Sequence, residues 1–283
     1  MESRASATVG EALPAAIDAL HAAGVENARL DAELLLCEAT GWDRARIAGD
    51  PELRLPVGSS RRFSEMTRRR VRREPVAYIL GRRAFRRIEL LVDRRVLIPR
   101  PETEFLVEAA VELSPRSVLD VGTGSGAIAL AIADELPGAR VLGIDTSAGA
   151  LRVAQANADR LGFGDHVDLV LRGISTLGEA MTDPLDLLVA NLPYVREEDW
   201  PELQPEIRDY EPREALVAGP SGLEAIESLL GVLGRIEGRP AAIALEVGFG
   251  QADQVATLVR AAGYQRADVR ADLAGIDRVV VGR

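Results

Sequence analysis

Residues 117–126 read SVLDVGTGSG, an apolar run that passes directly into three glycines separated by single residues. A strand followed by a glycine loop and an apolar helix is typical of a βαβ unit, in which the glycines let a ligand approach the backbone closely. Strand-like and helix-like segments then alternate towards the end of the chain. This pattern predicts an α/β fold with a parallel sheet and ligands at the carboxyl ends of its strands.

The expected elements follow from runs of apolar residues and their spacing. The expected strands cover residues 117–121, 140–145, 167–171, 185–191, 241–247 and 278–281. The expected helices of this region cover residues 127–135, 147–161 and 223–233.

The glycine loop predicts a nucleotide site, because Asp145 ends the next strand, about 20 residues on, where a carboxylate can accept hydrogen bonds from ribose hydroxyls. Dinucleotide folds prefer G-x-G-x-x-G, whereas this loop reads G-x-G-x-G after Asp120, an acid that would repel a pyrophosphate but suit an ammonium group. S-adenosylmethionine (SAM) carries a sulfonium, an ammonium group and a ribose but no phosphate. SAM is therefore the predicted cofactor, and an NAD-linked oxidoreductase is the competing class. The expected cofactor-binding residues are Asp120, Gly122, Thr123, Gly124, Ser125, Gly126, Asp145, Gly173 and Asn191.

A second motif, Asn191-Leu192-Pro193-Tyr194, ends the fourth expected strand at the same edge of the sheet. A primary amide or an exocyclic amine is a poor nucleophile, so its methylation requires acceptors that hold its N–H hydrogens. The Asn191 side-chain oxygen and the Leu192 carbonyl can accept them, Pro193 stiffens the turn, and Tyr194 can pack on a planar group. These four residues are expected to be catalytic.

The first 74 residues predict a separate helical domain, since apolar residues recur at helical spacings and glycines interrupt them at 24 and 41. From 75 to 98 the β-type runs Tyr78-Ile79-Leu80 and Val96-Leu97-Ile98 surround charged turns, which predicts a hairpin. The predicted organisation is a helical domain at 1–74, a β-hairpin linker at 75–98 and a catalytic domain at 99–283.

Composition excludes several classes of protein. The chain has 283 residues, 47% of them hydrophobic and 28% charged, the balance of a soluble globular protein. A net charge of −10 argues against stable nucleic-acid binding. One cysteine and two histidines, in no ligand pattern, predict no metal site, and no apolar run reaches the ~20 residues of a membrane helix. We expect a cytoplasmic protein, as a monomer.

The charge is unevenly distributed along the chain. Residues 61–100 contain 14 Arg and four acidic residues, a local net charge of +10, which leaves −20 for the other 243 residues. One interpretation is a solvated helix face followed by an exposed hairpin. The other is a docking surface for an acidic macromolecule, in which the field steers association.

The chain resembles the release-factor glutamine N5-methyltransferases, the HemK/PrmC family, over nearly its whole length. Beyond the glycine loop, the resemblance rests on EPVAYILG (74–81), VLIPRPETE (96–104), EPR (211–213) with Ala215-Leu216, and DLAGIDR (272–278). It implies a Rossmann-like class I methyltransferase sheet, an N-terminal all-helical substrate-recognition domain and a linking β-hairpin. It also implies SAM as cofactor, the GGQ glutamine of peptide-chain release factors as substrate, and a place for Arg100 and Glu102 beside the active site.

Two departures from the family pattern keep alternatives open. The family usually reads N-P-P-Y, whereas Leu192 stands at the second position here, as in adenine-N6 RNA dimethyltransferases. The third expected strand normally ends near an acid and an aromatic that contact adenine, whereas Arg172-Gly173-Ile174 stand here. The alternatives are therefore an adenine-N6 RNA or DNA methyltransferase and a non-catalytic, SAM-binding regulatory protein.

Overall fold

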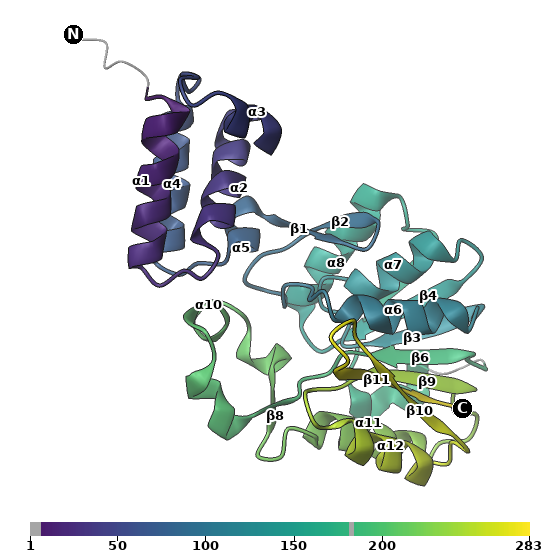
Figure 1. Cartoon of the computed structure of the whole chain (residues 1–283). Coiled ribbons are helices and arrows are strands. Elements are labelled where there is room, and N and C mark those ends of the chain that lie inside the picture. Colours follow the sequence, from purple (N-terminus) through teal and green to yellow (C-terminus); the bar gives the residue numbers. More distant parts are fainter. Residues whose placement is uncertain (1–6, 181–183) are drawn as a thin grey trace. The chain divides into compact units, whose positions relative to one another are not determined.

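The computed structural model describes residues 7–180 and 184–283 (Figure 1). The chain divides into two compact units. The helical unit holds the residues up to Gly81 together with Gln204–Tyr210, and the sheet unit holds Arg82–Leu203 and Glu211–Arg283. Residues 1–6 of the expected helical domain and 181–183 of the expected catalytic domain lie outside the described residues.

The helical unit is built around an apolar core. Its helices are α1 (Val9–Ala22), α2 (Ala28–Thr40), α3 (Arg44–Gly49), α4 (Ser59–Val71), α5 (Val76–Leu80) and α10 (Pro205–Arg208). Thr8 and Glu11 form a capping box that starts α1, because each side chain accepts the other's backbone N–H. Leu20, Leu35 and Phe63 are almost fully buried in this core. The expected all-helical N-terminal region is thus confirmed.

The predicted hairpin is wrong at both of its ends. Val76–Leu80 forms helix α5, where Pro75 precedes the first turn and Gly81 (φ +73°) ends it in the left-handed conformation. Ile79, a residue typical of strands, lies in this helix and packs into the core of the helical unit. Residues 96–98 form no strand, although Val96 and Ile98 are buried.

The hairpin itself is shorter than expected and belongs to the sheet unit. Strands β1 (Arg82–Phe85) and β2 (Ile88–Leu91) pair antiparallel. Phe85, Ile88 and Leu90 are buried in a core that also contains the main sheet. The hairpin is therefore a packed part of the sheet unit.

The main sheet has seven strands in the order β10-β11-β9-β6-β3-β4-β5. They are β3 (Ser117–Val121), β4 (Arg140–Asp145), β5 (Val167–Leu171), β6 (Leu187–Ala190), β9 (Ala242–Glu246), β10 (Ala267–Ala271) and β11 (Asp277–Gly282). Five strands are parallel, but β11 runs antiparallel to β9 and to β10. The predicted all-parallel sheet is wrong at this edge.

Helices cover both faces of the sheet (Figure 1). On one face lie α6 (Thr103–Glu112), α7 (Ala127–Glu135) and α8 (Ala148–Leu161), and on the other lie α9 (Leu177–Ala180), α11 (Glu224–Leu233) and α12 (Ala252–Ala261). Neighbouring strand residues alternate between the two cores: Val118 faces the first and Leu119 the second. The α/β fold with both faces covered is as expected.

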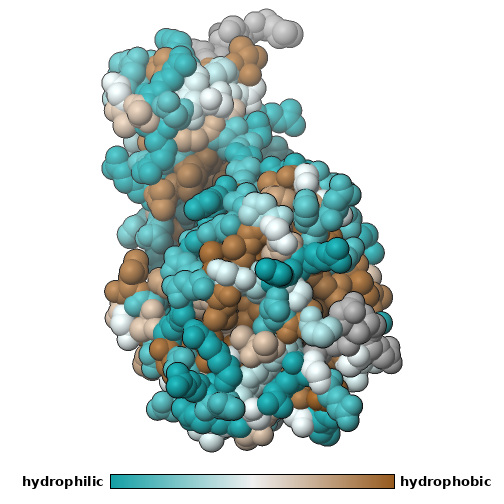
Figure 2. Space-filling model, turned by 90° about the vertical axis from the view of Figure 1, so that its right-hand side faces the viewer, coloured by the Kyte–Doolittle hydropathy of each residue, from teal (hydrophilic) through white to brown (hydrophobic). Residues whose placement is uncertain are grey.

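Short elements complete the sheet unit. Strands β7 (Val195–Arg196) and β8 (Val217–Gly219) form a small parallel pair, and 3₁₀ turns occupy Ile174–Thr176, Glu197–Glu202 and Arg213–Ala215. On the face shown in Figure 2, hydrophilic residues cover most of the surface, with hydrophobic patches between them. No helix within residues 7–180 and 184–283 is long and apolar enough to cross a membrane.

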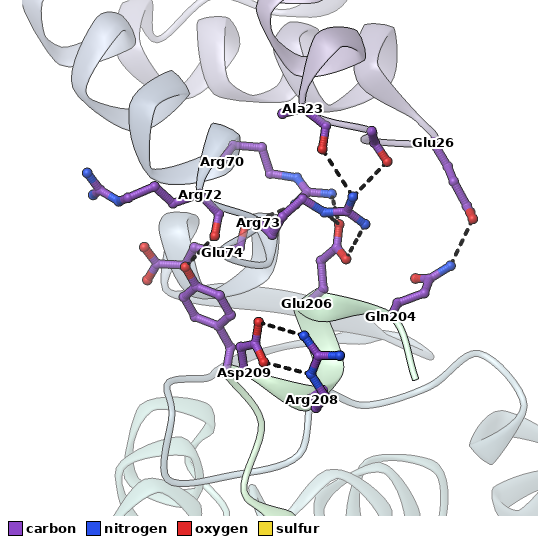
Figure 3. Close-up of polar contacts among 12 residues, drawn as sticks. Ala23, Glu26, Arg70, Arg72, Arg73, Glu74, Gln204, Glu206, Arg208 and Asp209 are labelled. Carbon is purple, nitrogen blue, oxygen red and sulfur yellow. Dashed lines mark hydrogen bonds and ion pairs between the residues drawn. The ribbon is translucent and has the colours of Figure 1, made fainter. Parts of the chain in front are cut away.

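A cluster of charges, the Glu206 cluster (Asp31, Arg70, Arg73 and Glu206), ties the segment 204–210 to the helical unit. Figure 3 shows Arg70 and Arg73 directed at Glu206. Arg70 donates to Asp31 (2.7 Å) and Glu206 (2.8 Å), and its side chain is only 7% exposed. Arg73 donates to both Glu206 oxygens at 2.7 and 2.6 Å. It also donates to the carbonyls of Ala23 and Gly24, the two residues after α1. The segment is therefore an integral part of the helical unit.

Ion pairs neutralise part of the basic segment 61–100. Eight of its Arg residues pair with carboxylates within their own unit, namely Arg62, Arg69, Arg70, Arg73, Arg82, Arg86, Arg95 and Arg100. Five of these eight, Arg62, Arg70, Arg73, Arg86 and Arg100, pair with acids outside the segment, so the local charge of +10 overstates the field that a partner would meet. On and beside α4, the exposed Arg61, Arg68 and Arg72 remain for a docking surface.

Candidate active site

A cavity in the sheet unit lies at the carboxyl ends of β3, β4 and β6, where the parallel strands predict a ligand. It brings together seven of the residues expected from sequence: Gly122, Gly124, Asp145, Gly173, Asn191, Leu192 and Pro193. Five others, Asp120, Thr123, Ser125, Gly126 and Tyr194, are not among its lining residues. Both predicted motifs therefore meet at one site.

The glycine loop bends tightly between β3 and α7. Gly124 has φ +57° and Gly126 has φ +82°, both in the left-handed region that side chains disfavour. A Cβ at Gly126 would lie 2.9 Å from Leu130 Cδ1, so glycine there also allows close packing on α7. The loop exposes its backbone to the cavity at Gly122 and Gly124.

Asp120 lies beneath this loop and does not face the cavity, in contrast to the expectation from sequence. Its side chain is fully buried, and Oδ2 accepts from Thr123 Oγ1 (2.7 Å) and from the Ala129 N–H (3.2 Å). Burial raises the pKa of Asp120 to about 7, the two hydrogen bonds oppose the shift, and the Asp145 charge adds to it. Asp120 therefore holds the loop onto the start of α7.

Asp145 stands at the end of β4 as predicted. Its Oδ2 accepts from the Gly124 N–H (2.9 Å) and its Oδ1 from the Ser147 N–H (2.8 Å). These bonds fix the carboxylate at the cavity wall while each oxygen keeps a further acceptor site. A ribose or another hydroxyl-bearing ligand is the group that such an acceptor binds.

Asn191 follows β6 and is held in one orientation. Its Nδ2 donates to the Thr103 hydroxyl at 3.0 Å, so its Oδ1 remains as an acceptor at the cavity. Leu192 is 5% exposed and, with Pro193, also lines the cavity. The site thus offers acceptors but, among its lining residues, no histidine or cysteine that could act as a base or nucleophile.

Tyr194 is anchored behind the cavity rather than lining it. Its N–H donates to the Leu216 carbonyl, and its own carbonyl accepts from Gln251 Nε2 at 3.2 Å. Burial, followed by the Glu246 charge, raises the pKa of Tyr194 to about 12, so the phenol stays neutral.

Two segments that no motif of the sequence placed at the cavity, Arg95–Leu97 and Pro212–Ala215, also line its wall. Glu211 joins them: it accepts from the Ile98 N–H (3.0 Å) and from Arg100 Nη2 (2.6 Å), and its side chain is 1% exposed. Arg100, expected beside the active site, therefore acts on Glu211. Both segments adjoin the motifs 96–104 and 211–213, the one signal that could have found them.

The described residues contain no cluster of side chains suited to a metal ion. Within the described ranges, no three His, Cys, Asp or Glu side chains gather closely enough to hold an ion.

Solved structures share the fold of this chain. The catalytic domain of hMettl16 in complex with MAT2A 3′UTR hairpin 6 superposes with a TM-score of 0.56 at 16% identity, over 68% of this chain and 75% of that one. The complex with hairpin 1 superposes with a TM-score of 0.57 at 14% identity, over 68% and 74%. At this identity the likeness concerns the fold alone, and it confirms the expected Rossmann-like methyltransferase sheet.

Sequence relatives are much closer. Residues 11–81 match the family described as PrmC N-terminal domain, and residues 118–210 match a methyltransferase domain. The release factor glutamine methyltransferase of Caulobacter vibrioides is 41% identical over 97% of this chain and 96% of its own length. That of Geobacter sulfurreducens is 40% identical over 92% and 91%. With both units and the cavity motifs accounted for, the chain belongs to the family of release factor glutamine methyltransferases.

Proposed function

We propose that this protein transfers a methyl group from SAM to the side-chain amide nitrogen, N5, of the glutamine in the GGQ motif of peptide-chain release factors, and so supports translation termination. The orientation of Asn191 carries the proposal, because its Nδ2 is engaged by Thr103 and its Oδ1 is left to accept an amide hydrogen. The relatives' name, release factor glutamine methyltransferase, supports this choice of substrate.

The cavity residues fit SAM. The backbone at Gly122 and Gly124 leaves room that side chains would fill, Asp145 can accept from ribose hydroxyls, and Ala150 and Ile174 supply apolar surface for an adenine. Gly173, expected to bind the cofactor, lies on the same wall. When bound, SAM supplies an electrophilic methyl group on a sulfonium.

Replacing Asp145 should weaken SAM binding. Asp145→Ala removes a charge-assisted acceptor worth roughly 1.5–3 kcal/mol, so the Kd for SAM should rise about 10- to 150-fold. Isothermal titration calorimetry with SAM, S-adenosylhomocysteine and NADH measures this directly. NADH binding by the unaltered protein, without SAM binding, would favour the oxidoreductase class instead.

The chain's own groups can prepare an amide for methylation. The Asn191 Oδ1 and the Leu192 carbonyl accept the two N–H hydrogens of the substrate amide, which turns the nitrogen lone pair away from them and stabilises the positive charge that develops on nitrogen. Pro193 limits the motion of the turn that carries both acceptors. No base is needed before transfer, because the methylated nitrogen is positively charged and then releases its proton to water.

Mass spectrometry distinguishes the candidate substrates. Release factor incubated with SAM and this protein should gain one methyl group on the GGQ glutamine, and a Gln→Ala release factor should gain none. The second candidate is an adenine-N6 activity, because Leu192 stands where the family usually has proline. Ribosomal RNA and DNA therefore belong in the same assay. Methylated adenine without methylated glutamine would replace the proposal, and SAM binding without transfer to any of these would favour the non-catalytic alternative.

Release factors are the proposed partners, and the exposed Arg residues of α4 are the proposed docking surface for them. Arg69 also lies in the basic segment 61–100, but it donates two bonds of 2.8 Å to Glu74 and is not available to a partner. Arg61, Arg68 and Arg72 are exposed and remain suitable. Their attraction to an acidic surface should weaken as salt rises, since exposed charges are screened over ~10 Å at 0.1 M.

Charge reversal tests this surface. Arg61, Arg68 and Arg72→Glu should raise the KM for intact release factor about tenfold at low salt and leave the KM for a short GGQ peptide unchanged. A triple reversal at the exposed Arg140, Arg266 and Arg283 of the sheet unit is the control, because it changes the net charge equally. Equal effects of the two triple variants would show that α4 carries only a solvated face.

A further inference from the structure

A buried polar chain leads from the sheet to Asn191. Glu246 ends β9 with 1% exposure, and Thr103 opens α6 with 3% exposure. Asn191 Nδ2 donates to Thr103 Oγ1 at 3.0 Å, and the Thr103 hydroxyl lies close enough to the Glu246 carboxyl to lower its pKa. Glu246 Oε2 is buried and has no hydrogen-bond partner among the described residues. All three residues belong to the sheet unit.

The direction of these hydrogen bonds follows from the donors available. A threonine hydroxyl has one hydrogen, and an ionised carboxylate has none. The Thr103 hydrogen therefore points to Glu246, and the Thr103 oxygen must accept from Asn191. Thr103 alone would accept either end of the Asn191 amide, because a hydroxyl can donate to Oδ1 as readily as it accepts from Nδ2.

We propose that Glu246 and Thr103 are positioning residues that hold the Asn191 amide with Oδ1 towards the substrate. With the Thr103 hydrogen committed to Glu246, the flipped amide would place Oδ1 against an oxygen that has no hydrogen to give. The inference rests on the proposed function, in which Asn191 Oδ1 accepts a hydrogen of the substrate amide.

The charge on Glu246 is sensitive to pH in the neutral range. Burial raises its pKa to about 7, the bond from Thr103 opposes the shift, Glu102 adds to it, and Arg278 and Arg100 oppose it. These groups come from the start of α6 and from β11, and Tyr194 faces the same carboxyl from the turn after β6. A protonated Glu246 could donate to Thr103, which would free the hydroxyl hydrogen for Asn191 Oδ1 and permit the flipped amide.

Substitutions at Thr103 test the arrangement. Thr103→Val keeps the side-chain shape without the hydroxyl and should lower kcat about tenfold, with the KM values for SAM and release factor unchanged. Thr103→Ser should restore kcat. Thr67→Val on α4 is the matched control: Thr67 is also buried, its hydroxyl donates to the Phe63 carbonyl, and it is not a residue of the cavity lining.

A double-mutant cycle separates positioning from a general structural role. In an Asn191→Ala background, Thr103→Val should cause no further loss of kcat, because Thr103 acts through Asn191. Additive losses, or full kcat in Thr103→Val, would overturn the inference while leaving the proposed function intact. Full kcat in Asn191→Ala would instead overturn the role of Asn191 in the proposed function.

The pH profile provides an independent readout. At saturating SAM, kcat should fall as the pH drops through about 7, and Glu246→Gln, whose side chain carries no titrating proton, should flatten this limb. Asp120 titrates in the same range, but it acts on the glycine loop, so its effect should fall on SAM binding. An unchanged limb in Glu246→Gln would overturn the role of Glu246, and thermal unfolding of each variant verifies that it is folded.

Discussion

Asn191→Ala should lower the turnover of release factor methylation by about 10²- to 10³-fold, the range found when one preorganised polar group is removed from an active site. Asn191 is the side chain whose oxygen is held at the cavity, and its partner Thr103 keeps it there. Alanine can neither accept the substrate amide hydrogen nor stabilise the charge on nitrogen. Single-turnover kinetics with saturating SAM measure the chemical step.

Two further variants show whether the loss is specific. Asn27→Ala removes an exposed asparagine of the helical unit that makes no side-chain cap bond, and its turnover should match that of the unaltered protein. Leu192→Pro restores the usual family residue without removing the carbonyl at that position, so activity should be kept or raised. The SAM affinity of Asn191→Ala should change little. Normal turnover in this variant would contradict the proposed site.

The strands around the site were predictable because their signals are local. The expected strands 117–121, 140–145 and 167–171 coincide with β3, β4 and β5, since each is a short apolar run bounded by turn residues. The carboxyl edge then followed from the parallel order. The antiparallel edge could not be predicted from the sequence, because β10 is largely exposed and has no apolar run that indicates a strand.

The cavity residues that lie away from the strand ends were less predictable than those at the strand ends. Gly122, Asp145 and Asn191 end strands and could be placed together from topology alone. Arg95–Leu97 and Pro212–Ala215 reach the cavity through Glu211, whose partners lie more than a hundred residues away along the chain. A contact of this range has no periodicity, so only the neighbouring motifs 96–104 and 211–213 mark it in the sequence.

Charge counts along the sequence were misleading for a related reason. The basic segment suggested a surface, but Arg70 and Arg73 meet Glu206, a residue that follows the catalytic motif by many positions. Folding thus buries part of the segment's charge against acids from elsewhere. Only a three-dimensional arrangement distinguishes a buried ion pair from an exposed patch.

Glu206→Ala should destabilise the helical unit by about 3 kcal/mol, because it leaves Arg70 and Arg73 without a shared counterion. Arg70 would retain only Asp31. The two tryptophans allow a direct measurement: Trp42 lies in the helical unit and Trp200 in the sheet unit. In a Trp200→Phe background, urea unfolding followed by Trp42 fluorescence should therefore report the helical unit.

The pH dependence of this loss has a definite sign. Burial alone would raise the pKa of Glu206, but the bonds from Arg73 and Arg70 outweigh it and hold the pKa below its ordinary value of 4.5. A lowered carboxyl pKa contributes stability that is present above pH 4.5 and lost as the pH falls through the folded-state value. The difference between Glu206→Ala and the unaltered protein should therefore be full at pH 7 and shrink below pH 4.5.

Asp209→Ala is the matched control on the same segment. Asp209 pairs with Arg208 at the surface, where both side chains are more than a third exposed, so its loss should leave the unfolding free energy nearly unchanged. If Glu206→Ala behaved like this control, the Glu206 cluster would contribute no more than a surface pair. Since Arg70 is 7% exposed and cannot reach water without disturbing its neighbours, we expect the two variants to differ clearly.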